Sequence, residues 1–352
     1  MTCTAPCGNS WTSLALRRPT PEMKSGWKGP VASAASLAVT AAFLFVLYRS
    51  LEMRAVARAL LGAHPGWLAV SVGMIVPITF LRAVRFFWVA PPGALPGVGE
   101  AFRLALAASA LNLVLPAKAG DLIKSYFVAT RSHTSAGVSV AIVVYERLCD
   151  LFGLIAWCLL AWVIARPVTP GVPTVFWILL GVVGAACTVL ISSERAASVF
   201  PLALTRVLPH RRLRKLRDLA AGWPDLLATL RGRRRWVLPF SLGLWLTHLI
   251  QIWLFTVTLD APVPFAVCAS LSAVALMAGQ LPLTVAGVGT RDLALVVLFS
   301  RYLAPETAAA LGVLVTTRNL LPPLIGIPLI GPYLSTVVGD ARRWRKALEA
   351  AE

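Results

Sequence analysis

Charged residues are scarce in this 352-residue sequence, and acidic residues are the scarcer kind. Only 14% of the residues are charged, with 15 Asp and Glu against 33 Lys and Arg, while 58% are hydrophobic. A soluble domain is far more polar, so the composition excludes that class and indicates an integral membrane protein. Apolar runs long enough to cross about 30 Å of hydrocarbon recur along the chain. They are 31–48, 67–90, 135–165, 172–192, 236–259 and 307–334.

The sequence also lacks the patterns of several kinds of site. Its four histidines and six cysteines show no metal-ligand spacing and no disulfide framework, and it contains no Walker-type phosphate loop and no Ser-His-Asp set. We therefore expect no metal and no other cofactor. The net charge of +18 does not indicate a nucleic-acid partner. The cations cluster outside the apolar runs, where they set the topology and meet anionic lipid headgroups.

The distribution of positive charge predicts the orientation of the chain in the cytoplasmic (inner) membrane. The loop 193–235 is rich in arginine, so the positive-inside rule places it in the cytoplasm, together with the tails 1–30 and 336–352. The links 166–171 and 260–264 carry almost no positive charge and are expected outside. The protein is therefore predicted to be multi-pass, with both termini in the cytoplasm.

Two apolar segments fit this path only as hairpins. The region 91–134 starts and ends in the cytoplasm yet contains AFRLALAASALNLVLP (101–116), whereas 264–302 enters and leaves from the outside. Breaks at membrane depth persist only where they are buried in protein or line a cavity. We predict an all-α integral membrane protein with about six full transmembrane helices and two opposed re-entrant hairpins. Eight spans are the alternative, since two near-full helices per hairpin fit the same charges.

The two hairpins resemble each other in sequence. The first reads NLVLPAKAGDLIK (112–124) and the second QLPLTVAGVGTRD (280–292), each with an amide, Leu-Pro, a glycine and an aspartate beside a cation. Asp121 precedes Arg147 by 26 positions, and Asp292 precedes Arg318 by 26. A chance match is the alternative to a repeat. We favour an inverted-topology repeat within a transmembrane domain at 31–335, because broken helices meeting near the midplane are typical of secondary transporters. The repeats are about 67–165 and 236–334.

Charged side chains in the segment YERLCDLFGL (145–154) lie near the predicted midplane. Each ionised group at this depth costs roughly 2.5–3.5 kcal/mol, so Glu146, Arg147 and Asp150 cannot all face lipid. They either pin helices together as internal ion pairs or line a polar cavity. Further charges in the second half favour the cavity. The candidate substrate-binding residues are Asn112, Lys118, Asp121, Lys124, Glu146, Arg147, Asp150, Gln280, Arg291, Asp292, Arg318 and Asn319.

Helix breakers explain how the hairpins turn. Prolines end helices and glycines allow tight turns, so we expect the turns at Pro116, Gly120, Pro282, Gly287 and Gly289. Freed N–H groups at a half-helix start, with the neighbouring cations, suit a phosphate.

Three other polar residues lie in the apolar spans and are not among these candidates. Arg82 and Arg85 are interpreted as snorkelling or interfacial side chains, and a role as substrate ligands is the alternative. His248 is interpreted as a hydrogen-bonded core residue.

These motifs resemble those of the lysylphosphatidylglycerol synthase transmembrane-region family, the flippase-like domain. The first family motif falls on Asn112 to Lys124 and continues as Glu-Arg-x-x-Asp at 146–150. The second falls on 281–292, where Ala286 interrupts the glycine pair. Lysine stands at 118 and 124 in place of the more usual arginine, and aspartate stands at 121 and 292 in place of glutamate. The resemblance covers roughly 31–335.

The resemblance implies movement of a lipid, such as an aminoacylated phosphatidylglycerol, across the cytoplasmic membrane. We expect a translocase for a phospholipid or lipid-linked headgroup that is anionic or bears a phosphate. The alternatives are a membrane component or partner of a lipid-modifying or polyprenyl-phosphate glycosyl-transferring enzyme, and a non-transporting scaffold. Two-domain members add a cytosolic aminoacyltransferase. This chain stops at Glu352, so we expect that it is not itself an enzyme and that a separate enzyme could supply its lipid.

Overall fold

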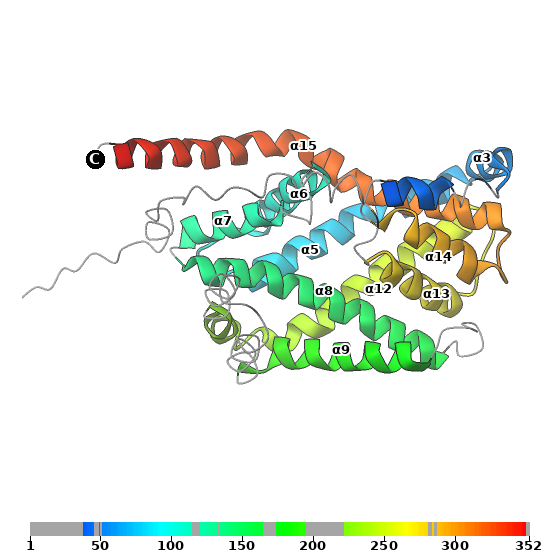
Figure 1. The fold of residues 1–352 in the computed structure, drawn as a ribbon, viewed down its shortest axis with the longest axis horizontal. Coiled ribbons are helices and arrows are strands. Elements are labelled where there is room, and N and C mark those ends of the chain that lie inside the picture. Colours follow the sequence, from blue (N-terminus) through cyan, green and yellow to red (C-terminus); the bar gives the residue numbers. More distant parts are fainter. Residues whose placement is uncertain are drawn as a thin grey trace, which may run out of the picture.

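Helices make up every regular element that the structure shows. The computed structural model describes residues 38–45, 49, 51–114, 120–132, 134–164, 174–194, 222–280, 284 and 287–349, and no strand occurs in them. Figure 1 shows the long helices running side by side along the longest axis of the molecule. The described helices are α3 (Met53–Leu61), α4 (Pro65–Gly73), α5 (Ile75–Val89), α6 (Val98–Val114), α7 (Asp121–Ser132), α8 (Ala136–Ile164), α9 (Thr174–Ser192), α12 (Arg234–Thr258), α13 (Phe265–Ala278), α14 (Thr290–Phe299) and α15 (Pro305–Glu349).

Long apolar helices confirm the predicted all-α membrane fold. Four stretches of the described chain are long and apolar enough to cross a membrane, namely Pro65–Val89, Thr174–Ser192, Arg234–Thr258 and Pro305–Gly339. Helix α8 is also long, at 29 residues, and it carries the charged segment at 146–150. Large apolar side chains cover the outer surface of α9, where Val175 and Ile178 are 72% and 62% exposed. Such a surface suits contact with lipid. The predicted first span, 31–48, lies largely outside the described residues.

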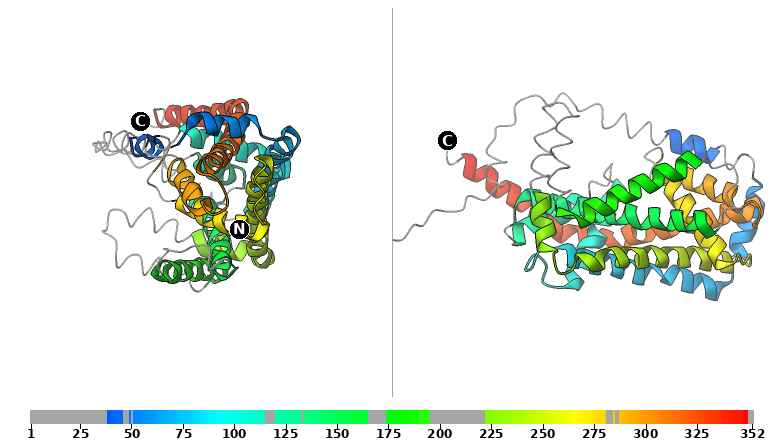
Figure 2. Two further views of the ribbon diagram at one scale, coloured as in Figure 1. Left: turned by 90° about the vertical axis from the view of Figure 1, so that its right-hand side faces the viewer. Right: turned by 90° about the horizontal axis from the view of Figure 1, so that it is seen from below.

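Two pairs of short helices take the places of the predicted hairpins. Helices α6 and α7 have 17 and 12 residues, and α13 and α14 have 14 and 10. All four are shorter than the roughly 20 residues that a full span needs. The pair α6–α7 occupies one half of the long axis and α13–α14 the other half, as Figures 1 and 2 show. This arrangement favours two opposed half-length hairpins over eight full spans. The repeat boundaries stay predictions.

Glycines bring the arms of each hairpin close together. A Cβ added to Gly120 would lie 2.5 Å from the carbonyl oxygen of Ala108 on α6. A Cβ on Gly287 would lie 2.4 Å from the carbonyl oxygen of Gly279, and Gly287 also has a φ of 73°. Gly289, with a φ of 94°, is the N-cap residue immediately before α14. These close approaches and positive φ values suit glycine, and the role of these residues as the hairpin turns stays a prediction. Pro116, Lys118 and Pro282 lie outside the described residues.

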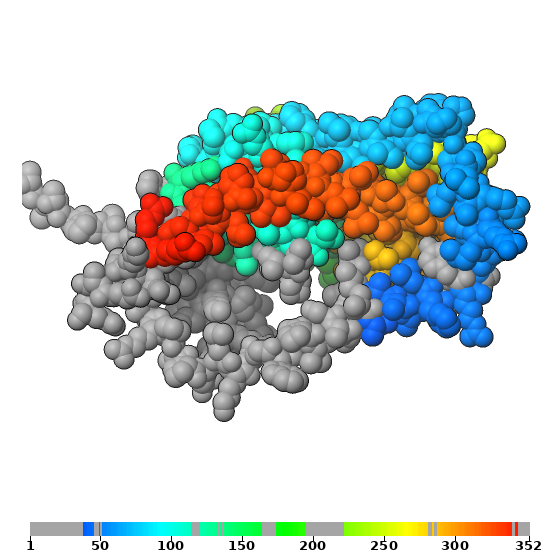
Figure 3. Space-filling view, turned by 90° about the horizontal axis from the view of Figure 1, so that it is seen from above, coloured from blue at the N-terminus to red at the C-terminus, as the bar shows by residue number. Residues whose placement is uncertain are grey.

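Helix α15 joins the two halves of the molecule. It begins beside α14, and its later part crosses one face of the bundle as a ridge, next to α6, in Figure 3. The two backbones meet at Gly326, where an added Cβ would lie 2.1 Å from the carbonyl oxygen of Leu106. Prolines at 322, 323, 328 and 332 lie within α15, and proline inside a helix removes a backbone hydrogen bond and bends the axis.

Substituting Gly326 with valine is expected to destabilise the protein by about 1–3 kcal/mol, because α6 and α15 must separate to admit the side chain. Thermal unfolding in detergent measures the effect. Gly331→Val on the same helix is the matched control, since no atom lies within 4 Å of its added Cβ. Equal losses of stability in the two variants would contradict close packing at Gly326.

Candidate functional site

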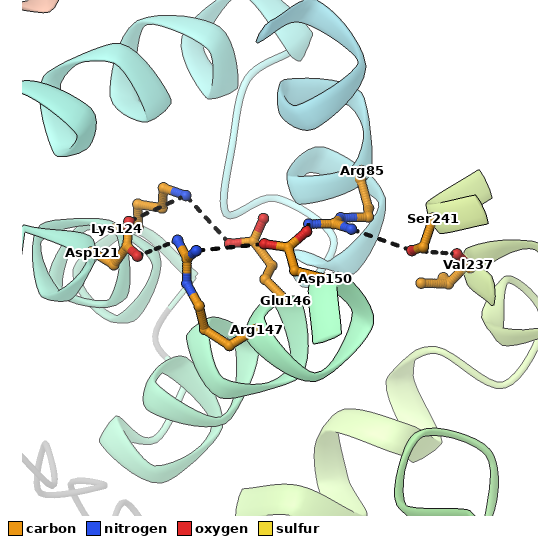
Figure 4. Close-up of polar contacts among 8 residues, drawn as sticks. All are labelled: Arg85, Asp121, Lys124, Glu146, Arg147, Asp150, Val237 and Ser241. Carbon is orange, nitrogen blue, oxygen red and sulfur yellow. Dashed lines mark hydrogen bonds and ion pairs between the residues drawn. The ribbon is translucent and has the colours of Figure 1, made fainter. Parts of the chain in front are cut away.

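Buried charges link four helices near the middle of the molecule. Arg147 of α8 forms an ion pair with Asp121 of α7 and lies 3.4 Å from Asp150. Asp150 in turn accepts a 2.5 Å bond from Arg85 of α5, and Arg85 donates a 3.2 Å hydrogen bond to Ser241 of α12. Figure 4 shows these groups in sequence, with Lys124 and Glu146 beside them. We call the six charged residues Arg85, Asp121, Lys124, Glu146, Arg147 and Asp150 the charged chain.

The positions of Asp121 and Lys124 on α7 explain their contacts in the charged chain. Asp121 is the first residue of α7, where a carboxylate complements the helix dipole, and its Oδ1 accepts a 3.2 Å bond from the amide of Asn112. Lys124, one turn later, lies 3.6 Å from Asp121 and 3.4 Å from Glu146. The ammonium of Lys124 also lies 5.1 Å from the ring centre of Phe86, within the range of a cation–π contact.

The charged chain is electrically balanced. Its three cations face three carboxylates, and each carboxylate has at least one cation within 4 Å. Pairing of this kind is what permits ionised groups to be buried. Only the side chain of Arg147 remains widely accessible, at 41%. The ion-pair interpretation therefore describes most of this cluster, and Arg147 is the member best placed to meet a ligand.

Arg85 was wrongly predicted to be interfacial. Its side chain is 2% exposed, and it is the partner of Asp150 and Ser241. The helical spacing of Arg85 relative to the apolar residues of α5 could have indicated that it is buried. Ile78, Arg85 and Val89 fall on the stripe of α5 that the bundle buries, so a side chain at 85 cannot extend to the headgroups.

The second hairpin holds a separate, local ion pair. Arg291 donates two hydrogen bonds to Oδ1 of Asp292, at 2.9 and 3.1 Å, and it also bonds the hydroxyl of Thr316 on α15. Oδ2 of Asp292 accepts a 3.0 Å bond from the backbone N–H of Gly289 and so caps α14. Both side chains are buried. The pair accounts for the charged sequence in this hairpin without a ligand.

Arg318 does not repeat the contact that Arg147 makes. Arg147 pairs with Asp121, 26 positions earlier, but the described residues give Arg318 no ion pair with Asp292 or with any other carboxylate. Arg318 instead donates to the backbone oxygen of His248 at 3.2 Å and to Oε1 of Gln251 at 3.0 Å. The equal spacing therefore produces different pairing in the two halves.

The remaining predicted residues are dispersed. Gln280 and Asn319 are exposed, and Asn112 is partly buried beside Asp121. Lys118 lies in 115–119, outside the described residues. The substrate-binding role of all these residues stays a prediction.

Two further polar residues, His248 and Arg82, lie outside the candidate set that the sequence predicted. His248 is 7% exposed, which confirms its prediction as a core residue, but neither ring nitrogen has the expected hydrogen-bond partner among the described residues. Arg82 lies one turn before Arg85 and has no hydrogen bond or ion pair with a described residue. It interacts electrostatically with both Asp150 and Arg318.

A pocket of about 440 Å³ lies elsewhere, where α5 ends and α12 begins. Trp88, Trp236 and Arg233 are among its lining residues, and no member of the charged chain lines it. Tryptophan and arginine are typical of the boundary between membrane and water. We therefore place the candidate site at the charged chain and Arg318 rather than at this pocket.

Comparison with known proteins agrees with the motifs. A comparison with curated proteins returned no match. The family model described as the lysylphosphatidylglycerol synthase TM region matches residues 33–326, which include both hairpins, the charged chain and Arg318. Because this match covers most of the chain, the protein belongs to the lysylphosphatidylglycerol synthase TM region family, a family of multi-pass membrane domains linked to lipid modification.

Proposed function

We propose that this protein moves a phospholipid or a lipid-linked headgroup across the cytoplasmic membrane. The headgroup would pass through a polar path between the two opposed hairpins, while the lipid tails stay in the bilayer. The termini and the basic loop 193–235 would lie in the cytoplasm, as the positive-inside rule predicts. A phosphate-bearing headgroup is the ligand that the cations suit best.

The charged chain is the observation that carries this proposal. It connects the first hairpin to α5, α8 and α12 inside the bundle, and six ionised groups are costly in a segment that lies within a membrane. An ion-pair network that only held helices together would be closed to solvent. Here Arg147 keeps 41% of its side chain accessible. The family, which is linked to lipid modification, supports a lipid as the ligand.

Arg147→Gln is expected to slow headgroup crossing at least about tenfold, because it removes the accessible cation of the chain while keeping a polar side chain. The assay uses liposomes that contain purified protein and a phospholipid with a fluorescent headgroup, and an impermeant reductant bleaches the outer leaflet. Arg103→Gln is the matched control, since Arg103 is an exposed arginine of α6. The proposal would be contradicted if headgroups crossed at the same rate with Arg147→Gln as with the wild type. It would also be contradicted if the wild type gave no faster crossing than liposomes without protein.

The alternative is a membrane partner of a lipid-modifying enzyme, and the family name favours it as a second candidate. Purified wild-type protein would then leave headgroups in their leaflet. It would raise the rate of a lipid-modifying enzyme only when both are reconstituted together.

A further inference from the structure

Two arginines in the bundle form no ion pair with any carboxylate that the structure describes. The charged chain is neutral in itself, and Arg291 is neutralised by Asp292. Arg82 and Arg318 are left over, and neither forms an ion pair with any residue that the structure describes. A cation without an ion-pair partner inside a membrane protein is costly, so two of them close together favour binding of an anion.

Arg82 lies on the inward stripe of α5. The stripe runs through Ile75, Ile78, Arg85 and Val89, which are all buried, and Arg82 falls between Ile78 and Arg85 at helical spacing. Its side chain is nevertheless exposed. Arg82 is therefore accessible to a ligand from outside the packed core.

Arg318 lies on the corresponding stripe of α15. Leu311, Leu314 and Val315 on that stripe are buried, and Arg318 itself is 5% exposed. Its guanidinium holds α12 through His248 and Gln251, but its Nε has no partner. Both ring nitrogens of His248 also lack partners. The Nε–H of Arg318 and the single N–H of neutral His248 are therefore buried donors that an anion would satisfy.

Helix geometry brings the two arginines together. Arg85 of α5 bonds Ser241 of α12, which fixes the register of these two helices. The two helices run in opposite directions. Arg82 lies one turn before Arg85 on α5, so it is level with the turn that follows Ser241 on α12. That turn leads towards His248. The repulsion between Arg82 and Arg318, and between each of them and His248 in its charged form, agrees with this proximity.

We propose that Arg82 and Arg318, with His248 beside them, form an anion subsite that binds one phosphate or phosphodiester group. This inference rests on the proposed function, because it adds a second phosphate contact to the polar path that includes Arg147. Two guanidinium groups on different helices can each donate paired N–H bonds to phosphate oxygens. Neutral His248 has one N–H to add as a donor.

The test is lipid binding to the purified full-length chain in a maltoside detergent, which has no phosphate. Thermal unfolding is followed while phosphatidylglycerol, phosphatidylcholine, diacylglycerol or inorganic phosphate is added. Phosphatidylglycerol should raise the melting temperature of the wild type by at least about 2 °C. Arg82→Gln and Arg318→Gln should weaken that binding at least about tenfold. Arg318→Lys, which keeps the charge, should retain more of the binding than Arg318→Gln, and Arg103→Gln should bind as the wild type does.

The added compounds identify the group that is bound. Binding of both phospholipids but not of diacylglycerol supports a phosphodiester, whereas an equal effect of inorganic phosphate supports a free phosphate in the same subsite. Diacylglycerol that binds as well as phosphatidylglycerol would overturn the proposal. Wild-type binding by both glutamine variants would also overturn it, and Arg82→Gln keeps the test valid if Arg318→Gln does not fold.

Transport by the same variants separates this inference from the proposed function. Headgroup crossing that survives Arg82→Gln and Arg318→Gln would refute the subsite and leave translocation standing. The opposite outcome is also informative. If the wild type binds the phosphodiester but moves no lipid, and both variants lose the binding, the subsite is supported and translocation is refuted.

Discussion

Asp150→Asn is expected to destabilise the protein by about 3–5 kcal/mol, the usual cost of removing one partner from a buried ion pair. Asp150 lies 2.5 Å from Arg85 and 3.4 Å from Arg147, and Arg85 is almost fully buried. The amide that replaces the carboxylate cannot neutralise either cation. Thermal unfolding of the purified protein, with the yield of monodisperse material, measures the loss.

Two further variants separate charge from shape at Asp150. Asp260→Asn is the matched control, because Asp260 is exposed and asparagine tolerates its positive φ of 53°. It should be close to neutral. The double variant Arg85→Met with Asp150→Leu removes both charges and should recover much of the stability lost by Asp150→Asn. If Asp150→Asn is as stable as the wild type, Asp150 does not compensate Arg85.

Gly287→Val is expected to cost about 3 kcal/mol or more, because it meets two obstacles at once. A β-branched residue strongly disfavours the φ of 73° found at Gly287. Its Cβ would also lie 2.4 Å from the carbonyl oxygen of Gly279, a backbone atom that cannot move aside as a side chain would. The second hairpin would have to open. Thermal unfolding in detergent and resistance to proteolysis measure the change.

The control for Gly287 is the same substitution at Gly243. Gly243 lies inside α12, and no atom lies within 4 Å of its added Cβ, so Gly243→Val tests valine in an uncrowded place. A loss of stability of the same size in both variants would show that the hairpin turn tolerates a side chain at 287.

The fold could be predicted from the sequence because it depends on local quantities. The length of each apolar run limits whether a helix can cross the membrane, and the loop charges set its direction. Together these predicted short α6–α7 and α13–α14 between long helices. Glycine at 287 and 289 predicted the turn for a similarly local reason, since only glycine adopts such φ values freely.

The candidate site could be predicted only in part. The sequence predicted that Glu146, Arg147 and Asp150 lie together, because residues three and four apart share a helix face. It did not predict that Arg85 completes the chain, since that contact joins α5 to α8 across 65 positions. It also suggested that Asp292 and Arg318 correspond to Asp121 and Arg147. In the structure Asp292 pairs with its neighbour Arg291, and Arg318 reaches α12 instead.

The sequence by itself determined that the protein is an all-helical membrane protein with two broken, charged hairpins, because hydrophobic length, helix breakers and loop charge act over short stretches of chain. Only the tertiary structure decided which charges neutralise one another. The interaction of two charges depends on their separation and on the surrounding dielectric, and across helices both are set by packing. That packing balances the charged chain and leaves Arg82 and Arg318 without a carboxylate among the described residues, as the cations that a ligand's phosphate would meet.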